Sequence, residues 1–183
     1  MKRIQEYQML LNASKIPYLE KKKSYLCESN CNSPENVAEI MEKCFQMSNL
    51  PEEHVYAIAL NTRSSIIGVF EISRGTVAAS LLSAREILIR MLIVGATHFL
   101  ICHNHPSGHL QPSKYDVDST KNIVNAGRTI GIPLVDHLII GDGRYVSLLE
   151  EYGKELFGWD TEERREHAVL KSRRFYTNRP SEQ

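Results

Sequence analysis

The chain has 183 residues, 42% of them hydrophobic and 24% charged, and its 22 lysines and arginines balance its 22 aspartates and glutamates. A chain of this length buries enough surface for one globular domain without covalent support from disulfides. The zero net charge excludes a generally basic protein and gives no support to nucleic-acid binding, which depends on clustered Lys and Arg.

Targeting and redox signals point to the cytoplasm. No signal peptide opens the sequence, and no segment approaches the ~18 consecutive apolar residues of a membrane span. We therefore expect a cytoplasmic protein without membrane contact, whose cysteines are free thiols. Cys27 and Cys31 have the spacing of half a zinc site, but no second ligand pair matches it. Cys44 and Cys102 are expected in the core.

The chain divides into three parts. Residues 1–32 are polar, and we expect an irregular N-terminal arm in contact with solvent. Residues 33–158 carry the periodic segments, so we place one domain there, with its core at about 50–150. Residues 159–183 mix both charges and predict an exposed helix or a frayed end.

The periodic segments alternate between helix and strand. Ser33 and Pro34 predict the start of a helix whose apolar residues recur every three or four positions. Two β-branched runs around a polar turn then predict a hairpin over 54–76. The next elements are a helix over 83–95, a strand over 97–102, a helix over 112–127 that ends at Gly127, and a hairpin over 132–149. The order helix–β–β–helix–β–helix–β–β predicts an α/β sheet sandwiched by helices.

Two histidines follow the short apolar strand. Because residues i and i+2 of a strand point the same way, about 6.5 Å apart, His103 and His105 can present two imidazoles to one point. Asp116 stands in the first turn of the next helix, after a Pro-Ser-Gly turn that can fold the chain back. Two neutral imidazoles and one carboxylate form a three-ligand zinc set that leaves the fourth position to water. Such a set suggests catalysis by one bound Zn²⁺ per chain.

Each of these ligands also has a structural interpretation. A histidine at a strand end is commonly a surface or hydrogen-bonded residue, and Asp116 follows Ser113 with the spacing of a capping box. Asp118 offers a rival carboxylate, but at about 100° per residue it lies about 200° around the helix, so only one of the two acids faces the strand end. The zinc-deaminase and H-E-x-x-H signatures do not occur in the sequence.

The pattern His103-x-His105-x7-Ser113-x2-Asp116 matches the JAMM, or MPN-plus, metalloprotease motif. With the strings FEISRGT, ARE and GIPLVDHLIIGDGRYVSL, residues 50–150 resemble the RadC-like branch of that superfamily. The resemblance implies a JAB/MPN-like α/β fold, layered like the cytidine deaminases. It also implies a zinc hydrolase, a metalloprotease or isopeptidase that cuts an amide bond in a peptide or protein substrate. Ser113 is then implied to help hold the substrate oxyanion.

Hydrolysis of this kind needs a carboxylate that moves a proton from water to the leaving amine. Three glutamates are candidates. Glu86 is already explained by a capping box with Ser83. Glu53 precedes the first apolar strand, where JAMM proteins carry their catalytic glutamate, and we favour it. Glu71 stays the alternative, because one residue of uncertainty in the turn between the two strands swaps their relative faces.

Other features limit what the resemblance transfers to this chain. The resemblance implies that full-length RadC-like proteins join a helix-hairpin-helix DNA-binding module to this domain. Residues 1–32 leave no room for such a module. DNA binding is therefore not carried over to this chain. The alternative to an enzyme is a non-catalytic or DNA-repair-associated scaffold. Ser113 is also the expected N-cap of its helix, a role that competes with catalysis. Asp136 and His137, a polar pair in an apolar strand, are expected to support the structure or to hold the metal ligands in place, rather than to bind the metal themselves. The sequence sets no oligomeric state.

Overall fold

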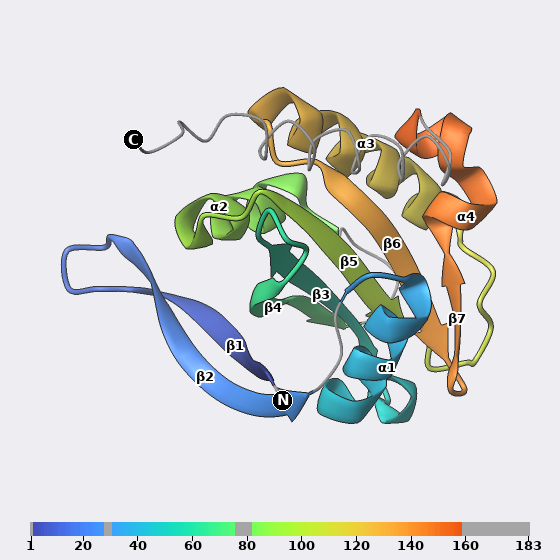
Figure 1. Cartoon of the computed structure of the whole chain (residues 1–183), viewed down its shortest axis with the longest axis horizontal. Coiled ribbons are helices and arrows are strands. Elements are labelled where there is room, and N and C mark those ends of the chain that lie inside the picture. The colour runs from blue at the N-terminus through green and yellow to red at the C-terminus, as the bar shows by residue number, and fades with distance from the viewer. Residues whose placement is uncertain (1, 28–30, 76–81, 159–183) are drawn as a thin grey trace, which may run out of the picture.

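The computed structural model describes residues 2–27, 31–75 and 82–158, so the predicted tail at 159–183 lies outside the described residues. Within these ranges the strands form one seven-stranded mixed sheet in the order β2-β1-β4-β3-β5-β6-β7, with helices on both faces (Figure 1). The elements in chain order are β1 Lys2–Leu11, β2 Pro17–Cys27, α1 Pro34–Phe45, the 3-10 turn Met47–Asn49, β3 Glu53–Leu60, β4 Ile66–Gly75, α2 Ala84–Val94, β5 His98–Asn104, α3 Lys114–Ile130, β6 Leu134–Gly141, β7 Arg144–Ser147, α4 Leu148–Tyr152 and the π-helical turn Gly153–Phe157. From α1 to β7 the predicted α/β order is confirmed.

The N-terminal residues form a β-hairpin, and the irregular arm expected there is wrong. β1 and β2 pair antiparallel along their length. β1 then joins the main sheet by parallel pairing of Glu6 with Val69 and of Tyr7 with Phe70. β2 is an edge strand whose side chains are mostly exposed. Edge strands commonly carry charged side chains, lysines above all. Because of this polarity, the sequence of the hairpin looks like that of an irregular, solvent-exposed arm.

A β-bulge directs one lysine of the hairpin toward the sheet. The register between β1 and β2 shifts after Glu6, which leaves Lys22 as the extra residue. Its ammonium lies 2.8 Å from Glu6 Oε1 and 3.2 Å from Glu71 Oε2. Glu6 is only 3% exposed, and its second oxygen accepts a hydrogen bond from the Tyr25 hydroxyl. The buried carboxylate is therefore compensated on both oxygens, and it fastens the hairpin to β4.

The sheet separates two apolar cores. The first core lies under helices α2, α3 and α4 on one face of the sheet, and the second core, the α1 core, lies under α1 on the other (Figure 1). Along the central strand β3, Val55 faces the first core and Tyr56 the second, and the alternation continues to Leu60. Cys102 is buried in the second core and Cys44 packs at its margin, as predicted. Among the described residues, no helix is both long and apolar enough to cross a membrane.

Helix α3 runs beyond the glycine at which the sequence predicts its end. Its C-cap is Gly131, whose φ of 82° is left-handed. Gly127 lies inside the helix, where an added Cβ would come within 2.6 Å of the Ile132 carbonyl oxygen. The predicted stop at Gly127 is therefore wrong. This glycine is explained by close packing of the helix against the segment that leads into β6.

Candidate metal centre

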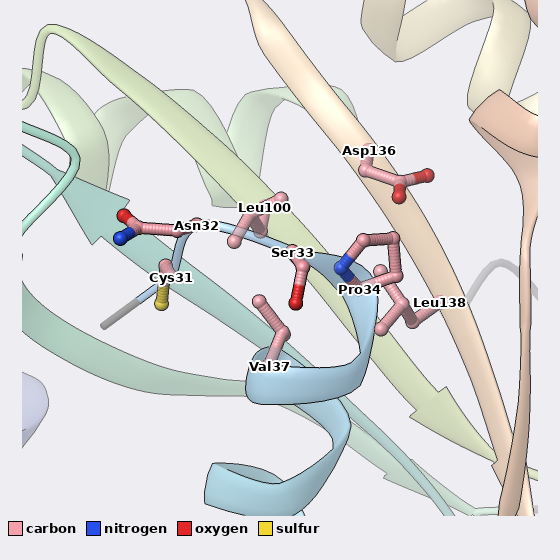
Figure 2. Close-up of a pocket in the computed structure, with 8 residues that line it drawn as sticks. All are labelled: Cys31, Asn32, Ser33, Pro34, Val37, Leu100, Asp136 and Leu138. Carbon is pink, nitrogen blue, oxygen red and sulfur yellow. The ribbon is translucent and has the colours of Figure 1, made fainter. Parts of the chain in front are cut away.

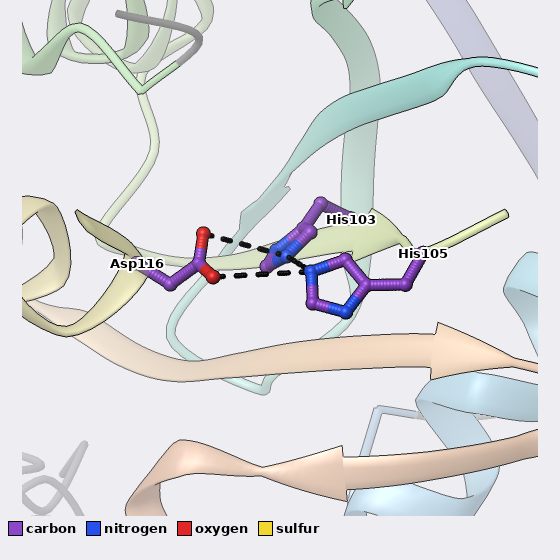
Figure 3. A group of neighbouring side chains, drawn as sticks. All are labelled: His103, His105 and Asp116. Atoms are coloured by element: carbon purple, nitrogen blue, oxygen red, sulfur yellow. Dashed lines mark hydrogen bonds and ion pairs between the residues drawn. The ribbon is translucent and has the colours of Figure 1, made fainter. Parts of the chain in front are cut away.

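The predicted ligands meet at one point beside the centre of the sheet. His103 and His105 lie at the end of β5, between β3 and β6, and Asp116 approaches from the first turn of α3 (Figure 3). His103 Nε2 lies 3.0 Å from His105 Nε2 and 3.6 Å from Asp116 Oδ1, while His105 Nε2 lies 3.8 Å from Asp116 Oδ2. Ligand atoms about 2.0–2.1 Å from a tetrahedral zinc stand about 3.3 Å apart. The three side chains therefore have the spacing that one ion requires.

The loop after β5 fixes the imidazole of His105. The backbone N–H of His105 donates to the Ile140 carbonyl at 2.9 Å, which holds the loop against β6. The ring Nδ1 lies 2.6 Å from the His109 carbonyl oxygen, and a carbonyl can only accept. Nδ1 therefore carries the ring hydrogen. Neutral His105 presents the lone pair of Nε2 to the site.

A buried chain of hydrogen bonds fixes the imidazole of His103. The Thr120 hydroxyl donates to the Asp116 carbonyl at 2.6 Å, so its oxygen must accept from His137 Nδ1, 2.7 Å away. Neutral His137 then accepts at Nε2 from His103 Nδ1, at 2.7 Å. His103 carries its hydrogen on Nδ1 and turns the lone pair of Nε2 toward Asp116. The side chains of Thr120, His137 and His103 are at most 3% exposed.

The site is chemically suited to a cation. Two nitrogen lone pairs, from His103 and His105, face each other across 3.0 Å, and Asp116 adds a carboxylate oxygen. A proton between the nitrogens is disfavoured, because burial lowers the pKa of His103 to about 4 even though Asp116 raises it. A divalent ion satisfies both lone pairs and the carboxylate at once. The residues present therefore fit the predicted metal.

Asp116 and Ser113 form the capping box that the sequence indicated. The Ser113 hydroxyl accepts from the Asp116 N–H at 3.1 Å, and Asp116 Oδ2 accepts from the Ser113 N–H at 2.8 Å. The same hydroxyl donates to Oδ2 at 2.6 Å. Oδ1 is left to face His103. Asp116 is thus both a cap and a potential ligand, and the oxyanion role of Ser113 stays a prediction.

Glu53 lies on the same sheet face as the two histidines. In the ladder between β3 and β5, Val55 pairs with His103, so the continued register sets Glu53 opposite His105. Burial raises the pKa of the Glu53 carboxyl, His105 lowers it and Asp116 raises it. Two of the potential ligands are therefore electrostatic neighbours of this carboxylate.

Glu71 lies on the opposite face of the sheet. A register shift between β3 and β4 pairs Glu71 with Tyr56, whose side chain faces the α1 core. Glu71 Oε1 lies 2.9 Å from His54 Nδ1, and Oε2 lies 3.2 Å from Lys22. Burial alone raises the pKa of Glu71, but hydrogen bonds from Lys22 and His54 hold it below its usual range. Glu86 lies in the first turn of α2, where it binds two arginines.

The remaining candidates lie away from the three ligands. Asp118 is exposed, and within the described ranges His103, His105 and Asp116 form the group of ligating side chains that can hold one ion. Cys27 and Cys31 are buried and form no disulfide bond. Asp136 accepts hydrogen bonds from the Ser147 hydroxyl and the Leu149 N–H, which is the expected structural role. Sequence reasoning missed Thr120, although it follows Asp116 by one helical turn.

A separate hollow lies at the start of α1, on the other face of the sheet (Figure 2). Leu100 and Leu138, which belong to the α1 core, form its floor. The other residues that line it are Cys31, Asn32, Ser33, Pro34, Val37 and Asp136. The sheet stands between this hollow and the three potential ligands, so the hollow is not part of the candidate centre.

A mixed sheet between helices, with a His-x-His pair after a central strand and an aspartate in the next helix, defines a JAB-type domain with a potential metal site. Comparison with protein families agrees. The family model described as the RadC-like JAB domain matches residues 31–154. The chain belongs to the RadC-like JAB domain family.

Named relatives are similar over about two thirds of the chain. A UPF0758 protein of Clostridium acetobutylicum is 39% identical over 119 residues, which are 65% of this chain and 51% of the relative. UPF0758 proteins of Caldanaerobacter subterraneus and a Geobacillus species are 40% and 43% identical over 65% of this chain, and 50% and 52% of their own lengths. The chain thus spans about half the length of these relatives. The family model begins at residue 31, so the N-terminal hairpin lies outside it.

Proposed function

We propose that this domain is a zinc-dependent hydrolase that cleaves an amide bond in a peptide or protein, as a metalloprotease or isopeptidase. The observation that carries the proposal is the pair of imidazole lone pairs that face each other across 3.0 Å beside Asp116. Bound by these three side chains, zinc would supply a Lewis acid that lowers the pKa of water and polarises a carbonyl. Three protein ligands leave one position open, which is typical of catalytic rather than structural zinc.

Glu53 is the proposed general acid and base. Its carboxylate accepts a proton from the attacking water and returns it to the leaving nitrogen when the amide C–N bond breaks. The register that sets Glu53 opposite His105 supports this assignment over Glu71, whose oxygens are engaged by His54 and Lys22. Partial burial favours the role as well, because it raises the pKa of Glu53 toward the working pH.

Ser113 has two proposed roles that one variant can separate. Its hydroxyl orients Asp116, and contact with a substrate oxyanion requires the hydroxyl hydrogen to rotate away from Oδ2. If Ser113→Ala weakens zinc binding and leaves kcat unchanged at saturating zinc, the residue supports the ligand. A lower kcat with intact zinc affinity indicates contact with the substrate.

A screen of peptides and isopeptide-linked substrates tests the proposed activity. Zinc-loaded protein is compared with the same protein after chelation, and with the Glu53→Gln variant. We expect cleavage that chelation abolishes, that zinc restores, and that Glu53→Gln loses while still binding zinc. The matched control is Glu71→Gln, which should stay active. Cleavage that persists in Glu53→Gln contradicts the assignment of the base, and zinc binding without cleavage of any substrate favours a scaffold.

A further inference from the structure

Asn104 separates the two histidine ligands in the sequence and is buried to 1% exposure. Because side chains alternate along a strand, it points away from the face that carries His103 and His105. Its side-chain oxygen accepts a hydrogen bond from the His54 N–H at 2.8 Å. Its amide nitrogen donates to the Glu52 carbonyl at 2.9 Å and lies 3.5 Å from that of Leu50. All these partners are backbone groups, and those of Glu52 and His54 flank the proposed base.

The Asn104 side chain makes hydrogen bonds to the segment around Glu53 just beyond the point where the pairing of β3 with β5 ends. The ladder between β3 and β5 runs from Leu60 and His98 to Val55 and His103. Beyond that pair, the Asn104 amide links β5 to the peptide groups on both sides of Glu53. One side chain therefore joins the strand that carries the histidines to the segment that carries the carboxylate.

We propose that Asn104 is a positioning residue that holds Glu53 at a fixed place relative to the three ligands. The inference rests on the proposed function, since it concerns the base of that reaction. A primary amide suits the place because it accepts and donates at the same time. An aspartate would accept only, and would place its charge against the Glu52 carbonyl oxygen. An aliphatic side chain would leave buried backbone N–H and C=O groups without partners.

Cobalt serves as the probe, because it reports distance from the ion without a substrate. In the Co²⁺-loaded protein, the pseudocontact shift of each backbone amide falls with the cube of its distance from the metal. A displacement of about 1 Å, the scale at which misplaced groups lose catalysis, lowers such a shift by roughly a third at close range. The zinc-loaded protein gives the diamagnetic reference.

We expect Asn104→Ala to change the shifts of the amides at Glu52, Glu53 and His54 by about a third or more. Shifts around Gly141, on the opposite side of the histidines, should stay the same, and the cobalt Kd should change less than about threefold. Asn61→Ala is the matched control. Asn61 also accepts from backbone N–H groups, but at the other end of β3.

The outcomes separate this inference from the proposed function. Unchanged shifts at residues 52–54 overturn the role of Asn104 and leave the metal centre standing. Equal changes all around the ion also overturn it, since they mean that the ligands themselves have moved. If wild-type protein does not bind cobalt, both proposals fall. Asn104→Gln, which keeps the amide but adds a methylene, gives the same test should Asn104→Ala not fold.

Discussion

The hydrogen-bond chain behind His103 leads to a prediction about a residue that never touches the ion. Thr120→Val removes a hydroxyl and keeps the shape of a fully buried side chain. The hydroxyl hydrogen now donated to Asp116 O is lost, and so is the acceptor for His137 Nδ1, 2.7 Å away. His137 can then move its hydrogen to Nε2, which forces His103 to carry its own hydrogen on Nε2, where the metal must bind.

The magnitude follows from the partners that are lost. Removal of an outer partner of a ligating histidine typically costs about 10- to 100-fold in metal affinity. A buried polar atom left without a partner, here Nδ1 of His137, also costs about 1–3 kcal/mol of folding stability. We therefore expect Thr120→Val to bind zinc about 10- to 100-fold more weakly, and to be less stable by an amount in that range.

The assay is competition for zinc against a chromophoric chelator, with urea unfolding measured in parallel. Thr129→Val is the matched control. Thr129 lies on the same helix and also bonds the carbonyl four residues back, but on the exposed side. We expect the control to bind zinc like wild type. If folded Thr120→Val keeps zinc affinity within about twofold, the hydrogen-bond chain does not set the tautomer of His103.

Other expectations concern the ligands, the base and pH. Asp116→Asn should weaken zinc binding strongly, whereas Asp118→Asn, which alters an exposed side chain, should leave it unchanged; equal effects would contradict the ligand assignment. Glu53→Gln should abolish hydrolysis with zinc retained and Glu71→Gln should not, and the reverse result would move the base to Glu71. The folded-state pKa of His103, about 4 against 6.5 unfolded, means that the unfolded chain binds more protons between these values. Urea unfolding of chelator-treated protein should therefore show stability falling from pH 6.5 toward 4, with a flatter slope in His103→Gln.

The candidate ligands could be predicted because local geometry and the match to the JAMM motif point to the same three residues. The period of a strand puts His103 and His105 on one side, and a capping box puts Asp116 at a helix start. The structure adds that the capping carboxylate is oriented by Ser113 through one oxygen while the other faces His103. The spacing of Ser113 and Asp116 in the sequence therefore predicts both roles of Asp116, as the cap of α3 and as a potential ligand.

The neighbourhood of the ligands could not be predicted, because it depends on register between distant segments. A register shift between Val55 and Tyr56, in the pairing of β3 with β4, sets Glu71 on the opposite face of the sheet from Glu53 and the histidines. Nothing in the sequence marks this shift. The contact of His137 with both His103 and Thr120 likewise depends on how β6 and α3 pack beside β5. The polar hairpin was missed because an edge strand lacks an apolar periodicity.

The zinc content of the purified protein, measured by elemental analysis and by titration, tests the candidate metal centre most directly. We predict one zinc per chain in the wild type, and loss of that zinc in the His103→Ala, Asp116→Ala double variant. Wild-type protein that binds no zinc, or a double variant that binds as much as wild type, would contradict it.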